Sequence, residues 1–116
     1  SITGATWLII GNLITIYLYP IYIAVPALIF LSIGDSFAAL FGKKIPKLKI
    51  GNKSIIGTLA GIFSSLSIAL LVNQILPTYV IVIGAVTAML VELIPSPLND
   101  NLTIPILSGL IMIIIL

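Results

Sequence analysis

Asp35 is the residue in this chain whose type and position most directly suggest chemistry. It lies inside a long apolar run, where an ionised carboxylate costs about 2.5–3.5 kcal/mol and normally faces a polar cavity or a partner. Its neighbours Ser32, Gly34 and Ser36 are small, so that another helix or a ligand can approach closely. Asp35 therefore either serves a site or is neutralised by a lysine, or by a proton, in helix packing.

A second polar group opens the following apolar run. Ser54 is a good N-cap, and a helix start offers amide donors and a positive dipole end. Lys53 adds a charge beside them, Asn52 precedes it, and Thr58 follows one turn below Ser54. This segment favours phosphate binding. The alternative is an ordinary cap next to a lysine that only sets membrane topology.

Two further acids lie later in the chain. Asn99-Asp100-Asn101 is flanked by prolines, and such a stretch is either a simple turn or a loop that presents ligands toward Asp35. Glu92 is the weaker candidate, because a carboxylate at a helix end can reach the membrane interface and pair with lysine. The chain has no cysteine and no histidine, so carboxylate and amide oxygens predict a hard cation such as Mg²⁺, shared with substrate phosphates.

The elements that must position these groups are helices. Hydrophobic residues make up 60% of the 116 positions and charged residues 7%, which excludes an ordinary soluble domain. The fold class predicted is therefore an all-α, polytopic membrane bundle. Proline and glycine divide the chain into five transmembrane segments, at about 4–18, 21–41, 54–76, 78–94, and from about 104 onward.

The lysines predict how this bundle is oriented. All five lie between the second and third helices, so the loop 42–53 is expected to be cytoplasmic. Counting crossings places the loop 95–103 on the same side, together with every acid and every lysine. A cluster of this kind does not indicate nucleic-acid binding. The isoleucine-rich composition favours a prokaryotic cell membrane over the endoplasmic reticulum.

Five short motifs, in this order, resemble the CTP-dependent lipid kinase family, which includes dolichol, phytol and CTP-using diacylglycerol kinases and is related to phosphatidate cytidylyltransferases. The motifs are Thr3-Gly4-Ala5-Thr6-Trp7-Leu8, Gly34-Asp35-Ser36-Phe37-Ala38-Ala39, Gly42-Lys43-Lys44, Lys53-Ser54-Ile55-Ile56-Gly57-Thr58 and Asp100-Asn101-Leu102. The resemblance implies a transferase of lipid metabolism and phospholipid biosynthesis. It would transfer the γ-phosphate of CTP to the hydroxyl of a polyprenol, phytol or diacylglycerol, with Mg²⁺ or another divalent cation.

The resemblance also implies roles for individual residues. Asp35 and Asp100 would be the catalytic and metal-binding acids. The nucleotide phosphates would be held by the remaining polar residues of the motifs and by Asn52, namely Lys43, Lys44, Asn52, Lys53, Ser54, Thr58 and Asn101.

The chain departs from the family in two respects. Many members carry an acid where this chain has Ile56. Members also usually have helices before the first segment found here. We therefore expect residues 1–116 to be one transmembrane domain, the C-terminal part of a longer fold, partnered by upstream helices or by a second copy.

Other functions remain open at this point. A cytidylyltransferase would make a CDP-lipid and release pyrophosphate, whereas a kinase would release CDP. A transport subunit would use Asp35 as a cation site inside the bundle. A structural subunit would use these residues only for packing.

Overall fold

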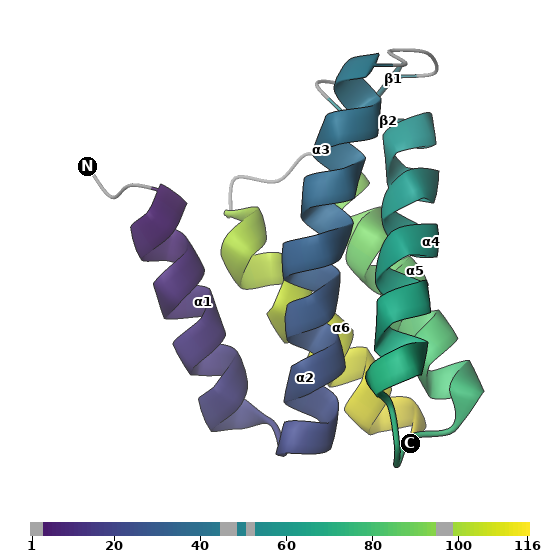
Figure 1. Cartoon of the computed structure of the whole chain (residues 1–116). Helices are drawn as coiled ribbons and strands as arrows, with labels where there is room; N and C mark the ends of the chain where they lie inside the picture. The colour runs from purple at the N-terminus through teal and green to yellow at the C-terminus, as the bar shows by residue number, and fades with distance from the viewer. Residues whose placement is uncertain (1–3, 45–48, 51–52, 95–98) are drawn as a thin grey trace.

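The structure is a computed structural model that describes residues 4–44, 49–50, 53–94 and 99–116, and it confirms the predicted all-helical class. The helices alternate in direction along the bundle (Figure 1). One of them is interrupted by a π-turn, η1, which joins α2 to α3 as a continuous helical segment. The elements are α1 (Gly4–Leu18), α2 (Ile21–Ile29), η1 (Phe30–Gly34), α3 (Asp35–Lys44), α4 (Ile55–Val72), α5 (Thr78–Leu93) and α6 (Asp100–Ile115).

A minimal β-pairing lies at one end of this bundle, where α3 ends and α4 begins (Figure 1). Strand β1 (Lys49–Ile50) pairs antiparallel with β2 (Lys53–Ser54), with Lys49 opposite Ser54. The predicted loop 42–53 therefore contains the last turn of α3 and most of this strand pair. Strand β2 leads directly into α4, so the backbone of this pair lies at the start of that helix.

The helix boundaries follow from proline and from capping side chains. Pro20 and Pro77 are the N-caps of α2 and α5, because proline has no N–H to donate and its φ suits a helix start. Ser54 caps α4 by accepting a hydrogen bond from the Gly57 N–H at 3.0 Å. Asn99 caps α6 in the same way, its Oδ1 accepting from the Asn101 N–H at 2.9 Å.

Three predicted helix boundaries were wrong. The third helix ends at Val72, four residues early, because the Asn73 side chain accepts from the Leu76 N–H at 2.9 Å and donates to the Leu76 carbonyl at 2.7 Å. These bonds hold a turn in front of Pro77. The last helix begins at Asp100 rather than near residue 104, so Pro105 lies inside it.

The loop predicted at 95–103 is correspondingly shorter. Asp100 and Asn101 form the first turn of α6 instead of belonging to a loop. Residues 95–98 lie outside the described part of the chain. The second helix is also longer than predicted, since it continues to Lys44 instead of closing near Phe41.

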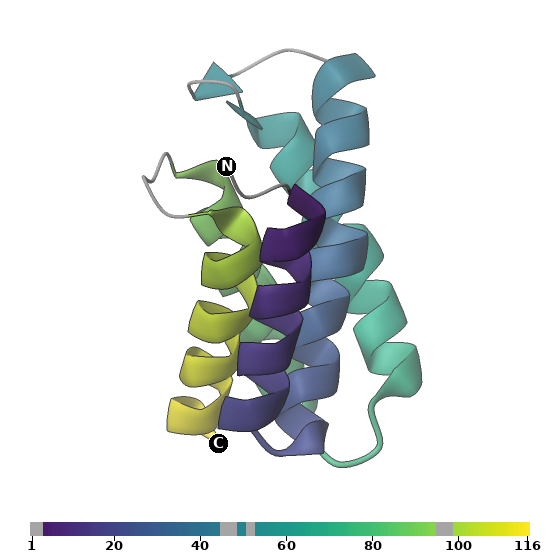
Figure 2. The same cartoon turned by 90° about the vertical axis from the view of Figure 1, so that its left-hand side faces the viewer.

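The helices pack closely because glycines replace side chains at their crossings. The core between them is made of large buried residues, including Phe30, Ile81, Met89, Ile104 and Met112. Helix α1 lies against α6 (Figure 2). At this crossing a side chain on Gly11 would collide with the backbone carbonyl of Asn101. Close approach of α1 to the first turn of α6 therefore requires glycine here.

A tyrosine joins the other end of α1 to α6. The Tyr19 hydroxyl donates to the Ile106 carbonyl at 2.6 Å, and its ring packs on Gly109, where a side chain would collide with it. Burial raises the pKa of the Tyr19 phenol, so that the hydroxyl keeps the proton it donates. The α1–α2 connection is thereby fixed to the middle of α6.

Two of the helical segments are long and apolar enough to cross a membrane. They are Ile21–Gly42, with 22 residues, and Ile55–Val72, with 18. The other helices of the described part of the chain are apolar but shorter, spanning Ala5–Leu18, Thr78–Leu93 and Asp100–Ile115. At about 1.5 Å per residue, a 16-residue helix is about 24 Å long.

Gly11→Ala is expected to destabilise the fold by about 1–3 kcal/mol, the usual cost of forcing extra atoms into a packed interface. Gly42→Ala is the matched control, because its nearest contact would be an ordinary 3.6 Å to the Ser54 Cβ. Thermal unfolding of the purified chain, followed by circular dichroism, measures both. Equal melting temperatures for the two variants would contradict the close α1–α6 contact.

A candidate metal centre of three carboxylates

Three acids from three different helical elements converge at one place. Asp35 opens α3, Glu92 lies in the last turn of α5, and Asp100 opens α6. One carboxylate oxygen from each lies within 4.8 Å of the other two. Glu92 is buried, with 3% of its surface exposed, and the other two are half-buried. We call these residues the carboxylate trio.

The π-turn places Asp35. A π-turn adds a residue to a helical turn, so the residues beyond it are rotated by about 100° relative to an uninterrupted α-helix. Asp35 is the first residue after η1, and the segment beyond it packs mainly on α4, whereas α2 packs mainly on α6. The extra residue thus turns Asp35 and the residues after it toward a different neighbouring helix.

Helix α5 carries Glu92 on its buried face. Ile81, Ala85, Ala88 and Met89 precede it at helical spacing and are all fully buried. The carboxylate therefore points toward the interior of the bundle at the end of an otherwise apolar stripe. In α6, Asp100 occupies the first turn, where the helix dipole favours a negative charge.

The predicted pairing of Asp35 with Asp100 matches this geometry, since both acids belong to the carboxylate trio. The third member, Glu92, was predicted as the weaker candidate, an acid that reaches the interface and pairs with lysine; its carboxylate lies beside the other two. The signal that identifies it is the spacing of Ala85, Ala88 and Met89, which puts residue 92 on the same buried stripe.

Five of the seven predicted phosphate-binding residues lie around the start of α4 and the end of α3. Ser54 is buried and caps α4, and the Thr58 hydroxyl donates to the Ser54 carbonyl at 3.1 Å. Lys43 and Lys44 form the last turn of α3, and Lys53 lies in β2.

Two more residues were predicted to bind phosphate. Asn101 lies in the first turn of α6, directly after Asp100, and its N–H is taken by the cap on Asn99. Asn52 lies outside the described residues. The segment that carries Ser54 packs closely against α3. Gly57 permits this approach, since a side chain there would collide with the Ala38 carbonyl.

The donor set of the trio fits a hard divalent cation. Carboxylate oxygens are the ligands that Mg²⁺ and Ca²⁺ prefer. At bond lengths of about 2.1 Å, two ligands on opposite sides of Mg²⁺ lie about 4.2 Å apart, and for Ca²⁺ the separation is about 4.6–5.2 Å. The three oxygens lie within 4.8 Å of one another, so they are close enough together to share one ion. Asp35, Glu92 and Asp100 would hold such an ion.

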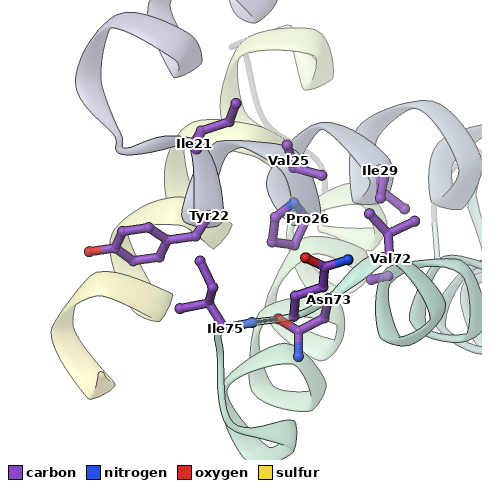
Figure 3. A pocket seen from close by; sticks show the side chains of 10 residues that line it. Ile21, Tyr22, Val25, Pro26, Ile29, Val72, Asn73 and Ile75 are labelled. Atoms are coloured by element: carbon purple, nitrogen blue, oxygen red, sulfur yellow. Dashed lines mark hydrogen bonds between the residues drawn. The ribbon is translucent and has the colours of Figure 1, made fainter.

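An apolar cavity of about 210 Å³ lies elsewhere, between α2 and the α4–α5 connection (Figure 3). Ile21, Val25, Pro26 and Ile29 line one side of it. Asn73 is a polar lining residue, and its side chain is hydrogen-bonded to the backbone of its own turn. This cavity contains no member of the carboxylate trio.

Sequence comparison relates this chain to one described only as uncharacterized. The chain is 32% identical over 112 residues to an uncharacterized protein of Rickettsia prowazekii, with 91% of this chain and 55% of that protein covered. The chain thus spans about half the length of this relative. No family model matches the chain, and no solved structure matches it.

Glu92→Gln is expected to weaken divalent-cation binding by about tenfold or more, because even partners behind the ligands contribute 10–100-fold to metal affinity. The amide keeps the shape of the side chain and removes its charge. Electron paramagnetic resonance titration with Mn²⁺ measures the affinity. Gln74→Ala, at an exposed residue in the α4–α5 connection, serves as the control. Unchanged Mn²⁺ affinity in Glu92→Gln would exclude Glu92 from the site.

Proposed function

We propose that this chain carries the cation and phosphate site of a membrane-bound kinase. The kinase uses CTP to phosphorylate the hydroxyl of a lipid alcohol. The observation that supports this most is the carboxylate trio, because two of its members are the acids to which the family resemblance gives metal and catalytic roles. The motifs around Lys53 and Ser54 add a phosphate-binding helix start at the same end of the bundle.

Location in a membrane is part of the proposal, with the chain as a polytopic bundle. Its support is the exposed apolar surface, since monomeric soluble proteins rarely expose large contiguous apolar patches. Tyr17 is 89% exposed, Leu71 83% and Ile21 76%, on three different helical elements or their ends. In a bilayer these side chains contact acyl chains, and the lysine-rich end of the bundle faces the cytoplasm of a prokaryotic cell.

In the proposed reaction the lipid hydroxyl oxygen attacks the γ-phosphorus of CTP. The bond from that phosphorus to the bridging oxygen of the β-phosphate breaks, and CDP leaves. The hydroxyl proton passes to a carboxylate of the site. A bound divalent cation supplies charge neutralisation for the phosphates. Lys53 and the amides at the start of α4 bind phosphate oxygens, while Asp35 and Asp100 orient the reacting groups.

Asp35→Asn is expected to lower lipid phosphorylation by about 100-fold or more, because a positioned carboxylate that accepts a proton contributes on that order. The assay incubates membranes with γ-labelled CTP and a panel of polyprenol, phytol and diacylglycerol. Ser67→Ala, whose hydroxyl only bonds the Phe63 carbonyl of its own helix, is the control. Activity of Asp35→Asn equal to that of the control would remove Asp35 from the mechanism.

The labelled product of the same assay separates the alternatives. Label in the lipid and unlabelled CDP identify a kinase. When phosphatidate is added as the acceptor, labelled pyrophosphate identifies a cytidylyltransferase. Label in neither product overturns the enzymatic proposal and leaves a transport or structural role.

Lys53→Ala is expected to raise the KM for CTP by about tenfold and to leave the KM for the lipid unchanged, because a charge-assisted hydrogen bond to phosphate is lost. Lys49→Ala is the matched control, since Lys49 lies on the partner strand opposite Ser54. Steady-state kinetics with each substrate varied in turn gives both constants. An equal rise for the two lysine variants would show that only the overall positive charge matters.

A further inference from the structure

Asn12 lies halfway along α1, and its side chain forms no hydrogen bond with any part of the chain that the structure describes. The side chains of Asn73 and Asn99, by contrast, are bonded to backbone groups of their own turns. Thr15, on the same helix as Asn12, donates to the Gly11 carbonyl at 2.7 Å. The Asn12 amide therefore has two N–H donors and a carbonyl oxygen still to satisfy.

This amide lies at the surface of the bundle. Asn12 is half-buried, and within the described residues no buried side-chain nitrogen or oxygen lacks a hydrogen-bond partner. Since Asn12 has no partner, its polar atoms must belong to the accessible part of the residue. Helix α1 packs on α6 and α2, and in Figure 2 no other described helix covers its outer side. The amide thus faces the surroundings of the protein.

The residues around Asn12 have the spacing of a helix-pairing seam. Ala5, Ile9, Asn12 and Ile16 follow one another at intervals of four, three and four residues. This 3.5-residue period keeps one side of a helix facing a parallel neighbour. Ile9 and Ile16 are each 58% exposed, and Ala5 is exposed as well. We call these four residues the α1 stripe. It is apolar and uncovered, with a single amide in it.

In the membrane proposed above, lipid cannot satisfy this amide. Asn12 is about 12 Å from the start of α1 and about 9 Å from its end, at 1.5 Å per residue. Acyl chains at that depth offer neither donors nor acceptors, so an unpaired amide is unfavourable there. Asparagine in a spanning helix typically bonds across to another helix. The α1 stripe therefore requires a helical partner with a donor and an acceptor at the level of Asn12.

We propose that this partner is the α1 helix of a second copy, so that two chains pair along the α1 stripe and their Asn12 amides bond to each other. The inference rests on the membrane location in the proposed function. An amide is both donor and acceptor, so two of them satisfy one another through reciprocal hydrogen bonds. A two-fold axis along the membrane normal makes the two helices parallel and puts each residue at the depth of its copy. The two amides then meet at one level, flanked by Ile9 and Ile16 of both chains.

Asn12→Leu is expected to weaken dimerisation by about tenfold, the order of the contribution of an interhelical hydrogen bond. Copies of the full chain carrying a donor or an acceptor dye at the N-terminus are mixed in phosphatidylcholine vesicles, and Förster transfer is followed as added lipid dilutes them. Asn12→Gln keeps the amide and is expected to retain most of the association. Ser67→Leu is the matched control, because it makes a similar change at an exposed residue of α4 whose hydroxyl bonds the Phe63 carbonyl of its own helix.

Cysteine cross-linking locates the contact and does not depend on the folding of Asn12→Leu. The chain has no cysteine, so a single introduced thiol reports on its own position. Ile9→Cys and Ile16→Cys are expected to give disulfide-linked dimers when oxidised with copper phenanthroline. Tyr17→Cys is expected to stay monomeric. Tyr17 is 89% exposed, and at about 100° per residue it lies about 140° around the helix from Asn12.

Each outcome supports or overturns the pairing. Dimers that Asn12→Leu weakens and Ser67→Leu does not, with cross-links at Ile9 and Ile16, support it. A wild-type chain that is inserted but monomeric at every protein-to-lipid ratio overturns it, and so do dimers that both leucine variants weaken equally or that cross-link only through Tyr17→Cys.

The same preparation separates this inference from the proposed function. A chain that sodium carbonate washes from the vesicles overturns the membrane location and the pairing together. A chain that dimerises as expected but phosphorylates no lipid overturns the proposed reaction alone.

Discussion

Repulsion between three carboxylates is the interaction on which the rest of this structure depends. Asp35, Glu92 and Asp100 come within 4.8 Å of one another in a chain that has five lysines and no other charged side chain. Away from bulk water such repulsion is strong, since the energy of two charges varies inversely with the dielectric constant. An arrangement of this kind persists only where positive charge or a shared proton offsets it. A divalent cation, with lysines at the same end of the bundle, supplies that charge in the proposed function.

The surroundings of this arrangement are closely packed. Carboxylates that repel one another push their helices apart, and the packing below them has to resist this force. Glycines at the crossings provide the resistance, because they let backbones and the Met89 side chain approach to contact distance. Dispersion is weak for each atom pair and large over such a surface. The apolar interior is therefore what holds the polar site together.

Much of the fold was predictable from the sequence, and the reasons are local. Pro20 and Pro77 start helices because of their own geometry. The common end of the bundle for Asp35 and Asp100 follows from counting alternating helices. The start of α6 could also have been predicted, since Asn99 is a good N-cap. The prolines around it led instead to the prediction of a loop. The early end of α4 depends on a side-chain turn at Asn73, which a hydrophobic pattern does not reveal.

The parts of the site that could not be predicted depend on contacts between distant segments. The π-turn at residues 30–34 has no sequence signature, because the extra residue is accommodated by what η1 packs against. To predict Glu92 as a member of the trio, the buried stripe of α5 would have to count for more than the position of Glu92 at a helix end. The pairing of β1 with β2 involves two residues on each strand. Short pairings of this kind are fixed by the helices that flank them rather than by strand propensity.

The distribution of the trio over α3, α5 and α6 has a consequence for how the protein is made. Its acids enter the growing chain at positions 35, 92 and 100, in that order. Until the ribosome has reached residue 92, Asp35 is the one member of the trio that has been made. The full repulsion arises only when α6 joins the bundle and adds Ile104 and Met112 to the core. Assembly thus meets its greatest electrostatic cost last, together with the α6 contacts that complete the core.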